Sequence, residues 1–280
     1  MKNSWKYLDK RNECIATLSI RPRRNFSAES FTRLVGEADR LEVFLRFLKF
    51  CDENVKRSKA LKPIRKIRKS ADKVLLVYQK ATLKNQIFIS SGDLTVKRSG
   101  KKEIENARQE FFKIDFEATA KEQSARFLDL DRSLRKTTRE DLARFQKRRH
   151  KRLIQLILKP LKKKNWHQKA EEIMGDLKIL QEIDTRVAYP YLPVLEAFHD
   201  LLLQWNGLLK HTALAVEMTK SRQMQDSDLG LVASWMVDAA QKKEDIKNKI
   251  LAEVEILKKS LPSRFTPAKK IHKESKVPVA

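Results

Sequence analysis

The chain has 280 residues, of which 41% are hydrophobic, and its formal net charge is +25. This length and hydrophobic content suffice for one or two domains with ordinary cores. The sequence has no apolar run long enough for a transmembrane helix and no apolar segment typical of a secretory signal near its start, so we expect no membrane insertion. Because it has only 6 glycines and 8 prolines, the composition predicts a mostly helical protein.

Two cysteines, Cys14 and Cys51, are too few for a disulfide framework, and Cys51 lies within an apolar run. We expect both to be reduced thiols in a cytoplasmic protein.

Positive charge is concentrated in two segments of the chain. Residues 56–80 contain 10 basic residues and 1 acidic residue, and residues 132–164 contain 14 basic and 2 acidic residues. Residues 168–261, by contrast, contain 12 basic and 15 acidic residues. Because a soluble surface usually mixes the two signs, these segments indicate a site for a polyanion, with a simple solvated helix face as the alternative.

The N-terminal quarter of the chain is predicted to contain an arm and a helix. Residues 1–27 are polar and are expected to form an N-terminal arm, with a short strand at Cys14–Ile20. Apolar residues at three- and four-residue steps then predict a helix over 28–53, with Ser27 or Ser30 as its N-cap.

The next predicted helix runs from residue 59 to about 83 and has two contrasting faces. Pro63 suits its first turn, where the missing N–H group costs little. The apolar face is made of Leu61, Ile64, Ile67, Ala71, Val74 and Tyr78. The cationic face and its flanks carry Lys62, Arg65, Lys66, Arg68, Lys69 and Lys73. We call these six residues the first strip.

An irregular connection is predicted over 86–100, followed by helical sequence with a break near 115–119 or near 129–131. The next helix begins at about Thr138 and ends or kinks at Pro160. Its cations lie opposite its apolar residues, and the ones selected as site residues are Arg144, Lys147, Arg148, Lys151 and Arg152. We call these five residues the second strip.

The second half of the chain predicts three further helices, over 166–186, 194–219 and 228–259, the last capped by Asp226 or Ser227. The predicted fold class is all-α, with two packed up-and-down helical bundles of about four helices each. After the N-terminal arm we expect a basic bundle over 28–165, a second bundle over 166–261 and a disordered basic tail over 262–280.

Motifs for catalysis are incomplete in this sequence. Glu196 and His199 form one E-x-x-H pair, whereas a di-iron site in a helical bundle needs a second copy. His167 and Glu171 form another pair without companions. No glycine-rich phosphate loop and no G-x-S-x-G nucleophile motif occurs. We therefore predict a protein that is not an enzyme, with no catalytic residue, no metal site and no cofactor.

The segment Lys62-Pro63-Ile64-Arg65-Lys66-Ile67-Arg68-Lys69, with the apolar run Val74–Tyr78, resembles the first motif of the CHAD family, the conserved-histidine α-helical domain. Lys62 stands where that family has its namesake histidine. The resemblance implies a pair of four-helix bundles that bind inorganic polyphosphate without catalysis. It also implies a cytoplasmic protein that can associate with polyphosphate granules.

The basic residues themselves predict a one-sided groove formed by the helices over 59–80 and 139–164, in which both strips face one extended anion. Inorganic polyphosphate is the first candidate ligand. Non-specific nucleic-acid binding and docking of an acidic protein partner are the alternatives. The sequence specifies neither the oligomeric state nor a contribution of the second bundle.

Overall fold

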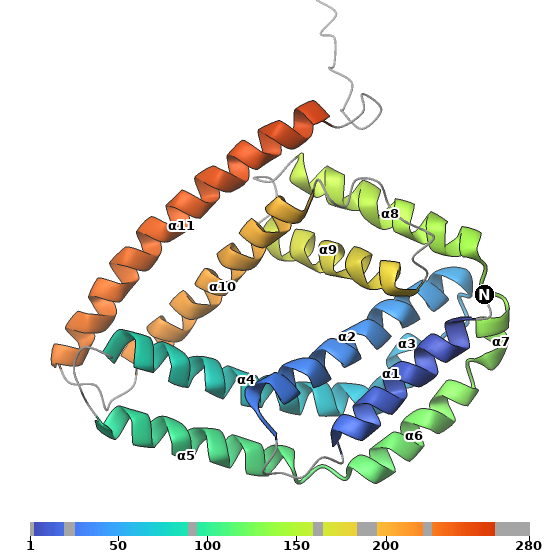
Figure 1. Cartoon of the computed structure of the whole chain (residues 1–280), viewed down its shortest axis with the longest axis horizontal. Helices are drawn as coiled ribbons and strands as arrows, with labels where there is room; N and C mark the ends of the chain where they lie inside the picture. The colour runs from blue at the N-terminus through green and yellow to red at the C-terminus, as the bar shows by residue number, and fades with distance from the viewer. Residues whose placement is uncertain are drawn as a thin grey trace, which may run out of the picture.

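The computed structural model describes residues 3–19, 26–88, 94–158, 165–183, 195–220 and 226–260. These residues form eleven α-helices and no strand, so the all-α prediction is confirmed (Figure 1). Within these ranges, no helix combines the length and the hydropathy needed to span a membrane. Both Cys14 and Cys51 are free thiols, and burial raises the pKa of Cys51 to about 12.

Helix α1 (Asn3–Ser19) replaces the predicted N-terminal arm, so that prediction and the strand at Cys14–Ile20 are wrong for the described part of α1. The buried side chains of α1 recur at helical steps, and they are Tyr7, Leu8, Ile15 and Leu18. These apolar residues are separated by charged ones, which conceal the helical period in the sequence. Contacts with α2 and α6 bury them.

Helix α2 (Ala28–Cys51) begins where the sequence predicts. Ser27 forms a capping box with Ser30, in which each side chain accepts a hydrogen bond from the other residue's backbone N–H. A short helix, α3 (Arg57–Ala60), leads into α4 (Lys62–Phe88), and Pro63 lies in the first turn of α4 as expected.

Of the two predictions about connections in the middle of the chain, one is wrong and one is confirmed. The predicted irregular segment over 86–100 is wrong where it is described, because α4 continues to Phe88 and α5 (Leu94–Phe111) begins at Leu94. The predicted breaks are confirmed: α6 (Phe116–Leu128) is capped by Asp115, and a turn separates it from α7 (Asp131–Arg135). Helix α8 (Arg139–Ile157) then starts after its N-cap Thr138. Pro160 lies outside the described residues.

The three helices of the second half lie within a few residues of their predicted positions: α9 (Trp166–Ile183), α10 (Glu196–Thr219) and α11 (Asp226–Ser260). Because α11 already begins at Asp226, the prediction that Asp226 or Ser227 is its N-cap is wrong. The predicted tail over 262–280 lies outside the described residues.

Three hydrophobic clusters hold the helices together. The largest combines α1, α2, the first half of α4, α6 and α7 with the start of α8 and the ends of α5 and α9. A second joins the end of α8 to α9, the start of α10 and the end of α11. A third joins the end of α4 to the end of α10 and the start of α11. The halves predicted on either side of residue 165 therefore share all three clusters, because α9 contributes to the first, α8 to the second and α4 to the third.

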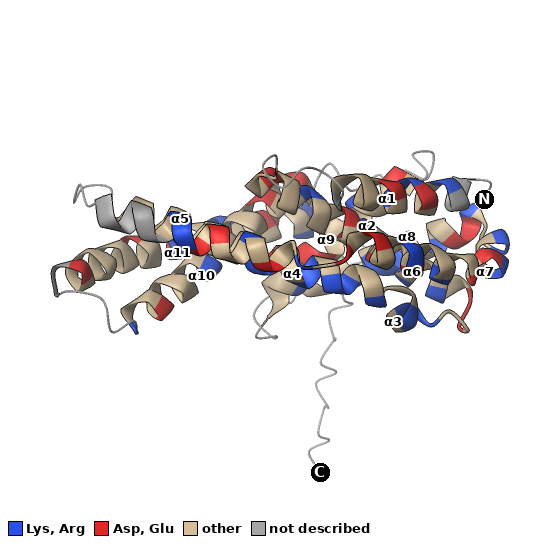
Figure 2. Cartoon of the chain, turned by 90° about the horizontal axis from the view of Figure 1, so that it is seen from below, with Lys and Arg blue, Asp and Glu red and all other residues tan. Residues whose placement is uncertain are grey.

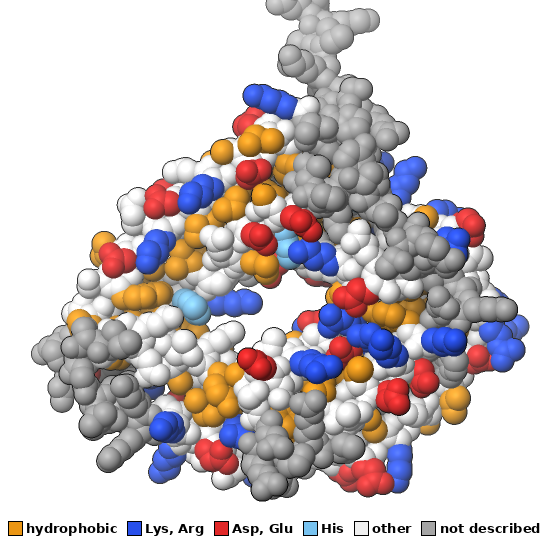
Figure 3. Space-filling view, viewed as in Figure 1, with side chains coloured by type: hydrophobic (Ala, Val, Ile, Leu, Met, Phe, Trp, Pro, Cys, Tyr) orange, Lys and Arg blue, Asp and Glu red, His pale blue; other side chains and the backbone are white. Residues whose placement is uncertain are grey.

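Helix α2 is the structural centre of the basic half. It packs against α1, α4, α8 and α9, and Figure 1 shows it between these neighbours. Figure 3 shows an opening through the molecule, and Figure 1 places α2, α4, α9 and α10 around it. Because α2 contacts both α4 and α8, side chains from each strip can reach its surface.

Candidate anion-binding site

The first strip lies on α4 with the orientation predicted from its periodicity. The apolar residues Leu61, Ile64, Ile67, Ala71 and Val74 are buried, and Tyr78 is half-buried. The four lysines of the strip are exposed and form no ion pair with any residue that the structure describes; they are Lys62, Lys66, Lys69 and Lys73. In the view of Figure 2, basic residues of α3 and α4 lie on the lower side of the molecule.

The two arginines of the first strip are partly neutralised by carboxylates. Arg68 forms an ion pair with Asp39 of α2 at 2.9 Å and lies 3.7 Å from Glu42, and Arg65 lies 3.4 Å from Glu42. Burial raises the pKa of the Asp39 carboxyl, and the charge of Arg68 opposes that rise. Arg65 and Arg68 therefore help to attach α4 to α2, which reduces the charge that they can offer to a ligand.

The second strip lies on the outer face of α8. Thr138 and Asp141 form a capping box at the start of this helix, and Asp141 also accepts a hydrogen bond from Arg144. Farther along, the guanidinium of Arg148 lies 5.9 Å from the centre of the Phe50 ring. Three other members are exposed and have no ion pair within the described ranges, namely Lys147, Lys151 and Arg152.

A basic hollow of about 1020 Å³ lies between α2, α8 and α9; we call it the α8 hollow. Its lining includes seven cationic side chains, namely Arg46, Lys49, Arg148, Arg149, Lys151, Arg152 and Lys169. The other described lining residues are Phe50, Phe145, Gln155 and Leu156, so no carboxylate occurs among the described residues that line the hollow. Five of the seven cations form no ion pair with a described residue, which favours a positive electrostatic potential in the hollow.

Two of the seven cations, Arg46 and Arg149, are held in place by hydrogen bonds to a buried carboxylate. Asp176 of α9 is only 3% exposed, and its two oxygens accept hydrogen bonds from Arg46, at 2.8 Å, and from Arg149. Glu172 accepts a second hydrogen bond from Arg46 at 2.6 Å. Burial lowers the pKa of Arg149 to about 10, and the nearby charge of Arg46 acts in the same direction. This network joins α2, α8 and α9 directly beside the hollow.

The prediction that both strips line one groove is not met at the α8 hollow. It contains Arg148, Lys151 and Arg152 of the second strip and no residue of α4. Arg68 instead lines a separate hollow of about 700 Å³ between α2, α4, α9 and α10. That hollow is mixed in charge, since its carboxylates are Asp39, Glu42, Glu171, Glu172 and Asp176. The strips diverge because α2 lies between α4 and α8.

Sequence reasoning missed four cations of the α8 hollow: Arg46, Lys49, Arg149 and Lys169. Arg149 had a usable signal, because it is four residues from both Phe145 and Leu153 and so belongs to the inner side of α8. An arginine at such a position needs a buried counter-ion. The other three lie on helices whose overall charge is not strongly basic, so no local signal singled them out.

The incomplete metal motifs acquire no further ligands among the described residues, where no group of three metal-ligating side chains occurs. His199 lies with its Nδ1 atom 2.9 Å from the Nζ atom of Lys178, and burial lowers the pKa of this histidine.

No protein-family model matches the chain, and a search of curated proteins found no match to its sequence.

The buried side of α8 predicts a pH dependence of stability. His150 is 0% exposed, and burial lowers its pKa to about 4 from an ordinary value of 6.5. The unfolded chain therefore binds a proton between these values while the folded chain does not, so stability falls as the pH is lowered from 6.5 towards 4. We expect His150 to account for a loss of about 2 kcal/mol between pH 7.5 and pH 5.

This loss can be measured by urea unfolding of the wild type and of a His150→Gln variant at both pH values. The variant should lose about 2 kcal/mol less than the wild type on acidification. Burial also lowers the pKa of His167 and His199, but both remain in the variant, so the difference isolates His150. An equal loss in the two proteins would contradict the assignment.

Proposed function

We propose that the chain binds inorganic polyphosphate, without catalysis, through the α8 hollow. The observation that carries the proposal is that seven Lys or Arg side chains from three helices line one concavity, in which the described residues include no carboxylate. Arginines give forked contacts to phosphate oxygens and lysines give mobile point charges, so both residue types suit a flexible phosphate chain. The resemblance of residues 62–78 to the CHAD motif supports the same class of ligand, and association with cytoplasmic polyphosphate granules would be consistent with it.

The aromatic residues of the hollow favour polyphosphate over a single-stranded nucleic acid. Proteins that bind single strands without sequence preference stack bases on accessible aromatic rings. Phe145 is 7% exposed and packs against Phe47 and Phe50, and Arg148 lies over the Phe50 ring. Neither ring is therefore presented to a base, whereas phosphate groups need only the cations.

The experiment is a competition measured by fluorescence anisotropy. Labelled long-chain polyphosphate is bound to the full chain and challenged, at fixed salt, with unlabelled polyphosphate, duplex DNA, single-stranded RNA and polyglutamate. Unlabelled polyphosphate should displace the label at the lowest concentration of charged groups. Displacement by RNA or DNA at a lower phosphate concentration would replace the proposal with nucleic-acid binding, and displacement first by polyglutamate would indicate an acidic protein partner.

The same assay, repeated over a range of salt concentrations, tests the physical basis of binding. The logarithm of the affinity should fall linearly with the logarithm of the salt concentration, because a multiply charged anion releases condensed counterions when it binds cations. A salt-independent affinity would contradict binding through the exposed cations.

A further inference from the structure

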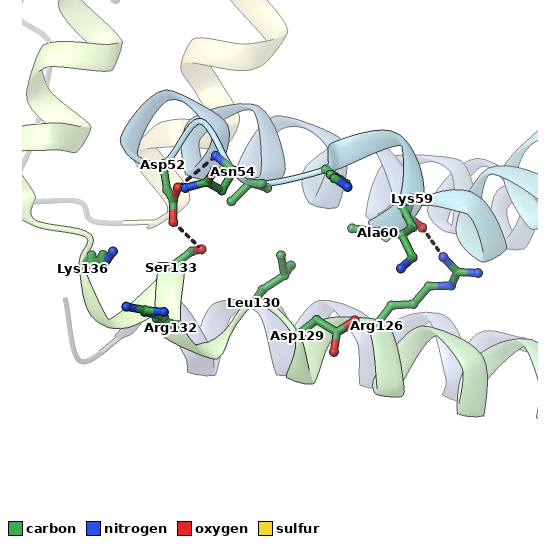
Figure 4. Close-up of a pocket in the computed structure, with 12 residues that line it drawn as sticks. Asp52, Asn54, Lys59, Ala60, Arg126, Asp129, Leu130, Arg132, Ser133 and Lys136 are labelled. Carbon is green, nitrogen blue, oxygen red and sulfur yellow. Dashed lines mark hydrogen bonds between the residues drawn. The ribbon is translucent and has the colours of Figure 1, made fainter.

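A second concavity lies beyond the C-terminal end of α2. It is bounded by the α2–α3 connection and α3 on one side, and by the end of α6 and by α7 on the other. We call it the α3–α7 hollow; its volume is about 470 Å³ (Figure 4). Its cationic lining residues come from segments more than 60 positions apart in the chain and are Lys56, Lys59, Arg126, Arg132 and Lys136. Neither strip defined from the sequence includes any of them.

Four of these cations are available to a ligand. Lys56, Lys59, Arg132 and Lys136 are exposed, and none forms an ion pair within 4.0 Å with a residue in the described ranges. Arg126 differs from them because it is already engaged by the carboxylate of Glu122 and donates to the backbone oxygen of Lys59 at 2.7 Å. It therefore positions α3 against α6 and is not counted among the cations available to a ligand.

The described lining of the hollow also has two carboxylates, and one of them accepts hydrogen bonds from neighbouring donors. Asp52 accepts a hydrogen bond from the backbone N–H of Asn54 at 3.0 Å and from the hydroxyl of Ser133 at 2.8 Å, as Figure 4 shows. The backbone hydrogen bond from Asn54, together with that from Ser133, lowers the pKa of this carboxyl, so it stays ionised. Asp129 is the one other acid among the described residues of the lining, so the four unpaired cations outnumber the carboxylates there.

The α3–α7 hollow lies near the α8 hollow on one side and near the start of the first strip on the other. Asp52 in its wall is two residues from Phe50, which lines the α8 hollow, and the two hollows therefore adjoin the same end of α2. On its other side, Lys59 is three residues before Lys62, the first exposed lysine of α4. Figure 2 shows α3 and α4 with their basic residues on the same side of the molecule.

We propose that the α3–α7 hollow is a second binding site for inorganic oligophosphate, occupied by another stretch of the same polyphosphate chain that enters the α8 hollow. The ligand class rests on the proposed function, and the site itself rests on the four unpaired cations. Occupation of two linked sites raises the affinity for a long chain without any new kind of contact, because binding at the second site is effectively intramolecular.

The test uses two variants of the full chain, with folding checked by circular dichroism and thermal unfolding. The site variant replaces Lys56, Lys59, Arg132 and Lys136 with Gln. The control variant removes the same charge from α5 and α11 by replacing Lys101, Lys102, Lys242 and Lys249, which are exposed lysines outside both hollows. Calorimetric titration with tripolyphosphate reports the number of sites, and anisotropy reports the affinity for long-chain polyphosphate.

The wild type and the control should bind two tripolyphosphates, and the site variant should bind one. For long chains we expect the site variant to lose about tenfold or more in affinity through lost avidity, and its salt slope to fall by about one for each lost cation that contacts a phosphate. If long chains bind and the site variant keeps both the stoichiometry and the affinity of the control, the second site is overturned while the proposed function stands. If the wild type binds neither short nor long polyphosphate, both proposals fail.

Discussion

Replacement of Arg148, Lys151 and Arg152 together with glutamate is expected to weaken the binding of long-chain polyphosphate by about 100-fold or more. All three side chains line the α8 hollow from one helix face, and none forms an ion pair with a residue that the structure describes. Each reversal removes one attraction and adds one repulsion, each on the order of 0.5 kcal/mol at an exposed site, so three reversals approach 3 kcal/mol.

The measurement is fluorescence anisotropy with labelled polyphosphate at low salt, where exposed charges are least screened. The matched control carries Lys101→Glu and Lys102→Glu on α5 and Lys242→Glu on α11. These three substitutions change the net charge of the chain by the same amount as the site variant. That control should lose only the part of the affinity that depends on the overall field. Equal losses in the two variants would show that net charge, and not the α8 hollow, determines binding.

Replacement of Asp176 with Asn is expected to destabilise the fold by about 3–5 kcal/mol, because it removes the charge of one partner from a buried ion-pair network. Asp176 is buried, and it accepts hydrogen bonds from the guanidinium groups of Arg46 and Arg149. Without its charge, two partly buried guanidinium groups from α2 and α8 repel each other at the centre of the helix packing. Urea unfolding followed by circular dichroism at pH 7.5 measures the loss.

Glu172 provides the matched control for this prediction, because it pairs with the same two arginines but its side chain is 56% exposed. Glu172→Gln should cost less than about 1 kcal/mol, as expected for an ion pair in contact with water. A variant that combines Asp176→Leu with Arg46→Met and Arg149→Met should recover most of the stability, since apolar residues of similar size often replace buried ion pairs at little cost. Similar losses for Asp176→Asn and Glu172→Gln would contradict the network.

The helical architecture follows from signals that are local in the chain. The apolar stripe from Leu61 to Val74 identifies the buried face of α4 because side chains three and four residues apart lie on one side of a helix. Ser27 and Thr138 locate the starts of α2 and α8 because each caps the backbone N–H groups of its own first turn. Such signals involve residues within a few positions of one another, so a single sequence is enough to interpret them.

Whether a cation is paired or remains available to a ligand cannot be read from local signals, because it depends on which residues distant in the sequence face that cation. Arg65 and Arg148 both lie in strongly basic segments, yet Arg65 lies beside Glu42, 23 positions away. Arg148 instead lies over Phe50, in a hollow where no described lining residue is a carboxylate. The burial of α1 has the same origin, since its apolar residues are interrupted by charges and α2 and α6 cover them only in the folded chain.

The sequence by itself therefore determined the all-α class, the positions of most helices, their buried faces and the two concentrations of positive charge. The tertiary structure decided which cations are paired and which line a hollow, and it separated the two strips by placing α2 between α4 and α8. The physical reason is range: helix periodicity and capping act within one or two turns, whereas the potential at a site depends on every charge within about 10 Å, whatever its position in the chain.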